Sequence, residues 1–138
     1  MSNELMNAIQ VSAKGMRAQG ERVRVITENV ANAETGATAP GEKPYTRKTI
    51  TFQNTLDKEL GIDLVSVKDI SQDQKSPYIT KYMPDHPGAN ENGYVEMPNV
   101  NMLVEMMDVR EAQRSYEANL GMIEQARSMI NRTIDLLR

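Results

Sequence analysis

The two ends of the chain carry apolar residues at alternating steps of four and three, the spacing that forms the seam of a coiled coil. The repeat runs from Leu5 to Ala33 in the first segment and from Met102 to Leu137 in the last. A helix with so narrow an apolar stripe is not stable by itself in water, because packing supplies most of a helix's stability. Both segments are therefore predicted to be long helices that need a partner.

Changes in composition divide the chain into three parts. Glycines and a proline after Thr35 interrupt the first helical pattern, so the first helix is expected to end at Glu34. The predicted parts are an N-terminal coiled-coil helix (residues 1–35), a loop and small β domain (residues 36–98) and a C-terminal coiled-coil helix (residues 99–138).

The middle of the chain contains short stretches that alternate in polarity and are rich in β-branched and aromatic residues. The predicted strands are residues 45–52, 62–70, 77–83 and 94–97. Asn92 and Gly93 form the dipeptide that a tight turn with positive φ prefers. The predicted fold class is α+β: long N- and C-terminal helices pairing as a coiled coil, with a small central, mainly antiparallel β domain.

Several small or charged residues take special positions in the predicted helices. Gly15 and Gly20 lie inside the first helix, where each costs about 1 kcal/mol relative to alanine, and small residues at such positions usually indicate a close neighbour. Asn99 or Asn101 can cap the last helix through a side-chain oxygen. Glu105 places negative charge near the positive end of that helix's dipole.

Composition argues against several classes of function. Sixteen basic and nineteen acidic residues leave a net charge of -3 and no basic face, so direct binding to nucleic acid or to an anionic membrane is not expected. The absence of cysteine excludes disulfides, thiolate metal sites and cysteine nucleophiles. Neither a cleaved secretory signal nor a transmembrane segment is expected, because no stretch is apolar enough for either.

The sequence offers no constellation of catalytic residues. The only histidine is His86, next to Asp85, and no further histidine or cysteine completes a metal site. A structural hydrogen bond is the expected role of this imidazole in its loop. We therefore expect no enzyme activity, no cofactor and no metal.

Two motifs carry a family resemblance. The run Asn29-Val-Ala-Asn32 near the end of the first helix, and the run Arg114-Ser-Tyr-Glu-Ala-Asn119 in the last, resemble the amino- and carboxy-terminal signatures of the bacterial flagellar rod and hook proteins. The motifs occur in the same order as in that family, and the resemblance covers nearly the whole chain.

The resemblance implies a structural subunit of the proximal rod, the drive shaft of the flagellar basal body in the periplasm. Such a subunit transmits torque through packed helices and is exported by the flagellar type III system. The implied partners are copies of the chain, other rod proteins, an adaptor at the MS ring of the membrane, and the export apparatus during secretion.

The apolar stripes and the motifs together predict a subunit interface. Asn29, Asn32 and Asn119 are expected to hydrogen-bond across subunits, and Arg114 to form ion pairs that fix register. The predicted interface residues are Leu5, Ile9, Met16, Val23, Ile26, Asn29, Val30, Asn32, Met102, Met106, Val109, Arg114, Tyr116, Asn119, Leu120, Ile123, Ile130 and Ile134.

Two other interpretations fit the same sequence. A soluble cytosolic coiled-coil adaptor or export chaperone would form a stable small oligomer without related partners. A small hydrolase on the β region would lose activity when His86 or Asp85 is changed.

Overall fold

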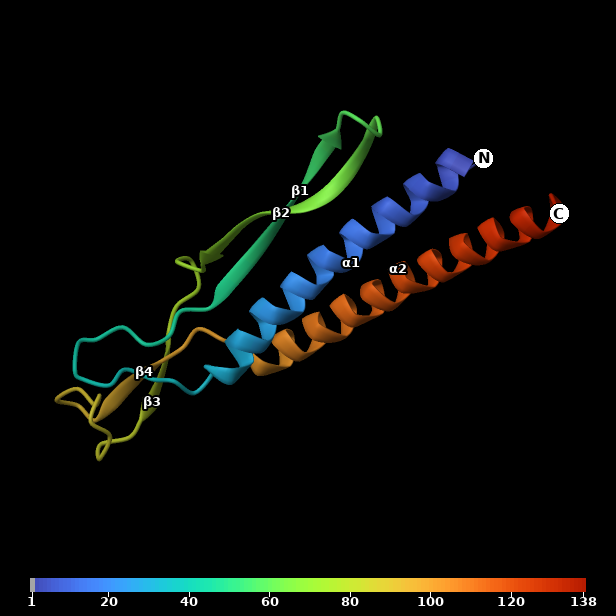
Figure 1. The fold of residues 1–138 in the computed structure, drawn as a ribbon. Coiled ribbons are helices and arrows are strands. Elements are labelled where there is room, and N and C mark those ends of the chain that lie inside the picture. Colours follow the sequence, from blue (N-terminus) through green and yellow to red (C-terminus); the bar gives the residue numbers. More distant parts are fainter. Residues whose placement is uncertain (1) are drawn as a thin grey trace. The chain divides into compact units, whose positions relative to one another are not determined.

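The structure is a computed structural model that describes residues 2–138 (Figure 1). Its elements follow the order α1 (Ser2–Ala31), β1 (Lys48–Asp57), β2 (Ile62–Gln72), β3 (Ile79–Tyr82), β4 (Tyr94–Met97) and α2 (Met102–Leu136). The predicted α+β class, with a helix at each end and a small β region between, is confirmed. Neither helix, over the described residues, has the length and apolar character needed to cross a bilayer.

The chain forms two compact units. The helical unit combines the chain up to Val23 with Thr51–Asp69 and Arg110–Arg138, and the central unit combines Arg24–Ile50 with Ile70–Val109. Both helices contribute residues to each unit, and each unit is described by itself below.

The four strands form two separate two-stranded sheets, whereas one sheet was expected. β1 pairs with β2, and β3 pairs with β4 in antiparallel register, with Tyr82 opposite Tyr94 and Ile79 opposite Met97. The rings of Tyr82 and Tyr94 meet edge to face with centroids 5.3 Å apart. Because an isolated two-stranded hairpin is marginal in water, each sheet depends on further contacts with the rest of the chain.

A tight turn follows β2 and precedes β3. The carboxylate of Asp73 accepts hydrogen bonds from the backbone N–H groups of Lys75 (3.0 Å) and Ser76 (3.1 Å). The side chain of Asn99 donates to the backbone carbonyls of Asp73 (3.0 Å) and Ser76 (3.1 Å). These bonds hold the segment between β2 and β3 in a turn.

β1 begins at Lys48, three residues after the expected start at Tyr45. The backbone N–H of Arg47 donates to Oδ1 of Asn99 (2.8 Å), and that of Lys48 donates to Oδ1 of Asn29 (2.8 Å). Asparagine side chains therefore take the place of a neighbouring strand at this end of β1.

In the helical unit, α1 and α2 lie side by side and run antiparallel (Figure 1). Leu5 near the start of α1 and Met129 near the end of α2 line the same groove. A Cβ atom on Gly15 would lie 2.9 Å from Nδ2 of Asn119, so the close neighbour predicted for this glycine is confirmed. At Gly20, no atom beyond the adjacent residues and the nearby backbone of α1 lies within 4 Å of such a Cβ atom, so the close neighbour predicted there is absent from the described chain.

α1 ends at Ala31, before the expected Glu34. The side chain of Asn32 turns back and donates to the carbonyl of Glu28 (2.9 Å), while its own carbonyl accepts from the backbone N–H of Thr35 (3.0 Å). The exposed carbonyls at this helix end are thus satisfied by a tighter turn.

α2 begins with the cap that the sequence predicted. Oδ1 of Asn101 accepts hydrogen bonds from the backbone N–H groups of Leu103 (3.0 Å) and Val104 (3.3 Å), which is the N-cap arrangement. Asn99, the other candidate, is buried and bonds elsewhere in the central unit.

The two helix glycines are expected to respond differently to alanine. Gly20→Ala should raise the free energy of unfolding by roughly 0.5–1 kcal/mol, because alanine favours the helix and the position is open. Gly15→Ala gains the same propensity but must displace the side chain of Asn119, so it should leave stability unchanged or lower it. Urea unfolding followed by circular dichroism measures both, and equal stabilisation would contradict the close contact at Gly15.

Candidate assembly surface

A buried polar cluster in the central unit joins the end of α1 to the chain before β1 and to the first turns of α2. Asn29, which is 1% exposed, donates to the carbonyl of Lys48 (2.8 Å) and to Oε2 of Glu105 (3.2 Å). Its Oδ1 accepts from the backbone N–H of Lys48 (2.8 Å) and from the hydroxyl of Tyr45 (2.8 Å). The expectation that Asn29 bonds across subunits is therefore wrong, because its amide is buried and fully engaged inside the chain.

Glu105 is the centre of this cluster and is 0% exposed. Its Oε1 pairs with Nε of Arg47, whose other guanidinium nitrogens lie 4.0 Å from a carboxylate oxygen of Asp73 and 3.9 Å from one of Asp108. A buried carboxylate is costly unless it is both paired and hydrogen-bonded. Here both oxygens have partners, one from Arg47 and one from Asn29.

The environment of the cluster shifts the pKa of two of its members. Burial, together with the negative charges of Glu28 and Glu105, raises the pKa of Tyr45 to about 12. The hydroxyl of Ser76 donates to Asp73 (2.7 Å) and, with nearby backbone N–H groups and Arg47, holds the pKa of Asp73 below its usual range. At neutral pH, Tyr45 therefore stays protonated and can donate, while Asp73 stays charged.

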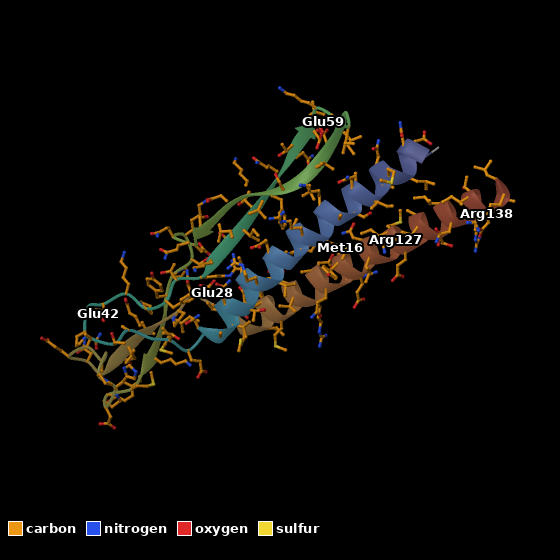
Figure 2. The ribbon with its side chains drawn as sticks, viewed as in Figure 1. Met16, Glu28, Glu42, Glu59, Arg127 and Arg138 are labelled. Carbon is orange, nitrogen blue, oxygen red and sulfur yellow. The ribbon has the colours of Figure 1, made fainter. Side chains whose placement is uncertain are left out.

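α2 leaves a row of large apolar side chains at the surface, and Figure 2 shows side chains projecting from this helix on the side away from α1. The residues of the predicted stripe that are 40–52% exposed are Met102, Met106, Tyr116, Leu120 and Ile134. The residues that α2 buries are Glu105, Ala112 and Ala126, none of which belongs to that stripe. The heptad of α2 therefore marks the exposed side of the helix more than its contact with α1.

Further exposed apolar residues of α2 lie outside the predicted heptad stripe. Among them are Leu103 (68% exposed), Met107 (62%), Met122 (55%) and Leu136 (87%). In the first turns of α2, every residue from 102 to 107 except Glu105 is exposed, and all the exposed ones are apolar. The signal in the sequence was a continuous apolar run interrupted by a single acid.

The predicted interface residues of α1 are less exposed than those of α2. Half-buried side chains belong to Leu5, Ile9, Met16, Val23, Val30 and Asn32 on α1, and to Val109, Asn119, Ile123 and Ile130 on α2. Arg114 is exposed, whereas Ile26 is only 4% exposed and, like Asn29, is an interior residue of the chain. Contact of the remaining residues with a partner stays a prediction.

His86 has the structural role expected from the sequence. Its Nδ1 accepts a hydrogen bond from the backbone N–H of Gly88 (3.0 Å) and so shapes its own loop. Among residues 2–138, no group of three or more histidine, aspartate or glutamate side chains is arranged to hold a metal ion.

The raised pKa of Tyr45 predicts a loss of stability between about pH 10 and pH 12. The folded chain keeps this proton to higher pH than the unfolded chain, so raising the pH through this window favours unfolding. Below the window, the protonated tyrosine makes its full contribution to the free energy of unfolding. Urea unfolding at several pH values should show the decline, and Tyr45→Phe should reduce its slope. An identical slope in both proteins would contradict the assignment to Tyr45.

Comparison with known proteins places the motifs in a family. A family model described as "Flagellar basal body rod FlgEFG protein C-terminal" matches residues 91–136, which include β4 and α2. A flagellar basal-body rod protein FlgC of Agrobacterium fabrum is 45% identical over 134 residues, which cover 97% of this chain and 96% of the relative.

Two relatives of lower identity belong to the same family of rod proteins. The FlgC proteins of Borreliella burgdorferi and Escherichia coli O6:H1 are 37% and 34% identical over 152 and 132 residues. These alignments cover 97% and 96% of this chain, and 98% and 97% of the relatives. At this identity over nearly the whole length, the chain belongs to the family of flagellar basal-body rod proteins FlgC.

Proposed function

We propose that the chain is a structural subunit of the bacterial flagellar rod and works in its proximal part, where copies and related rod proteins pack into a shaft. The observation that carries the proposal is the row of exposed apolar side chains on α2, in a chain of this family. The family is a structural one, and we assign the chain no catalytic role.

The exposed row supplies the kind of contact that a shaft needs. Fully burying a methionine or leucine side chain is worth about 1.5–3 kcal/mol, so a few such residues per neighbour hold subunits together. Contacts between unlike faces of identical subunits generate helical arrays, which a shaft requires. Torque is then carried by many contacts spread along each helix.

The chemistry of the row suits neighbours that are related but not identical. Met102, Met106, Met107, Met122 and Met129 are all at least 44% exposed. Methionine is unbranched and flexible, so it adapts to different partner surfaces better than a β-branched residue does. Exposed charges such as Arg114 add little strength, about 0–1 kcal/mol per pair, and we assign them to register.

Further partners and the location follow from family membership alone. We propose that the subunit is exported by the flagellar type III apparatus, takes its place in the periplasmic rod and contacts an adaptor at the MS ring. Each of these statements rests on the rod family.

Charged substitutions in the apolar row should block assembly without unfolding the chain. Met106→Glu and Leu120→Glu change exposed positions, so the isolated variants should keep their helix content, while burial of the new carboxylate against a neighbour costs several kcal/mol. Expressed in a strain that lacks the native gene, each variant should abolish swimming in soft agar. Gln125→Glu, an exposed position on the same helix, is the matched control and should swim normally.

Cell fractionation separates the rod subunit from the adaptor or chaperone. Purified basal bodies should contain the parent chain and the Gln125→Glu control but not the two row variants. A parent chain that stays in the cytosol as a small oligomer and is missing from basal bodies would support the adaptor instead.

A further inference from the structure

Three methionines gather in one stretch of the central unit, and we call them the methionine cluster. Met102, Met106 and Met107 lie in the first turns of α2 and are 46%, 52% and 62% exposed. The other exposed residues between them are also apolar, and the only buried side chain in this run is that of Glu105. The three thioether groups therefore belong to one apolar patch that water reaches.

Exposed thioethers react with peroxides. In a chain without cysteine, methionine carries the only sulfur that hydrogen peroxide can oxidise. A lone pair on the sulfur attacks one oxygen of hydrogen peroxide, the O–O bond breaks and an S–O bond forms. A proton moves from the transferred oxygen to the departing one, which leaves as water. The thioether loses two electrons and becomes a sulfoxide, and the peroxide is reduced by the same two electrons.

Met97, at the end of β4 in the same unit, is protected from this reaction. Its side chain is 6% exposed. A Cβ atom on Gly36 would lie 2.8 Å from Sδ of Met97, so the sulfur itself is packed against the glycine. Peroxide must reach the sulfur, so Met97 reacts only when the unit opens locally. Burial thus separates the reactivity of Met97 from that of the methionine cluster.

Oxidation changes the surface of the cluster and leaves the interior of the unit intact. A sulfoxide is polar and chiral, so it loses the apolar character and the adaptability that methionine brings to a contact. Three sulfoxides within two turns of helix place polar oxygens across the whole patch. The bonds of Glu105 to Arg47 and Asn29 involve no methionine, so the fold of the unit should persist.

We propose that Met102, Met106 and Met107 form a peroxide-reactive modification site, at which sulfoxide formation in the unassembled subunit makes the start of α2 polar and keeps the subunit out of the rod. The effect on assembly rests on the proposed function. The reactivity of the cluster does not, and it is measured in the isolated full-length chain.

The first experiment maps oxidation in the isolated chain. Hydrogen peroxide is added, the reaction is stopped with catalase at intervals, and the sulfoxide at each methionine is quantified by peptide mass spectrometry. Each methionine of the cluster should react at least about tenfold faster than Met97, because Met97 becomes accessible only on local opening. In urea the difference should disappear. The helix content of the oxidised native chain, measured by circular dichroism, should match that of the untreated chain.

The second experiment follows oxidised subunits in cells that lack the native gene and the methionine sulfoxide reductases, which would reverse the modification. The chain is expressed first and treated with peroxide, and another rod protein is induced only after catalase has removed the peroxide. All copies of the chain therefore meet peroxide before the rod can form. The fraction of chains with sulfoxide in the cluster should be at least about fivefold lower in purified basal bodies than in the unassembled chain, because a sulfoxide disrupts apolar contacts.

Two sets of leucine substitutions assign the effect to the cluster. The first changes Met102, Met106 and Met107, and the matched control changes the exposed methionines of the helical unit, Met6, Met122 and Met129. Each set is scored as the ratio of basal-body content with and without peroxide, so differences in the starting level cancel. The cluster set should lose less than about half of its content, because leucine stays apolar and is not oxidised, whereas the control set should lose as much as the parent chain.

Three results would overturn the proposal. They are oxidation of Met97 as fast as the cluster in the native chain, cluster sulfoxides as frequent in basal bodies as in the unassembled chain, and equal losses from the two leucine sets. A parent chain that is missing from the basal bodies of untreated cells contradicts the proposed function. In that case the effect of oxidation on assembly fails with it, while the selective reactivity of the isolated chain stands.

Discussion

The burial of one carboxylate constrains the central unit more than any other interaction. Glu105 is buried at the start of α2, and the ion pair with Arg47 and the hydrogen bond from Asn29 offset the free-energy cost of burying its charge. The three residues come from the last helix, the segment before β1 and the end of the first helix. Their meeting fixes where these segments lie within the unit, and removing one partner would leave a buried charge unpaired at a cost of about 3–5 kcal/mol.

The same constraint explains why the first turns of α2 are polar inside and apolar outside. In natural sequences, the local pattern of polar and apolar residues usually matches the tertiary packing. Mismatches between the two occur mainly at functional sites. Exposure of Leu103 and Met107 beside a buried Glu105 is such a departure. Apolar area that burial would remove from water is thus left exposed in the single chain.

The sequence predicted the elements well and their contacts poorly, for a physical reason. Heptads, turn dipeptides and the cap at Asn101 are local signals, because each depends on residues a few positions apart. The hydrogen bond between Asn29 and Glu105 joins residues 76 positions apart, and no local sequence pattern predicts it. The turn between β2 and β3 likewise involves Asn99, which reaches back 26 residues to Asp73. Such contacts follow from the tertiary fold and not from periodicity.

The motifs that carry the family resemblance also have a role inside the subunit. Asn29 of the first motif joins the buried cluster, and Asn119 of the second lies against Gly15. Since amides in these places satisfy backbone and charged groups of their own chain, they hold the helices in one geometry. Exposed apolar residues such as Met106 and Leu120, which we propose as assembly contacts, take no part in these polar contacts. We propose that a fixed polar core with an adaptable apolar surface allows related rod subunits to share one fold while each fits its own neighbours.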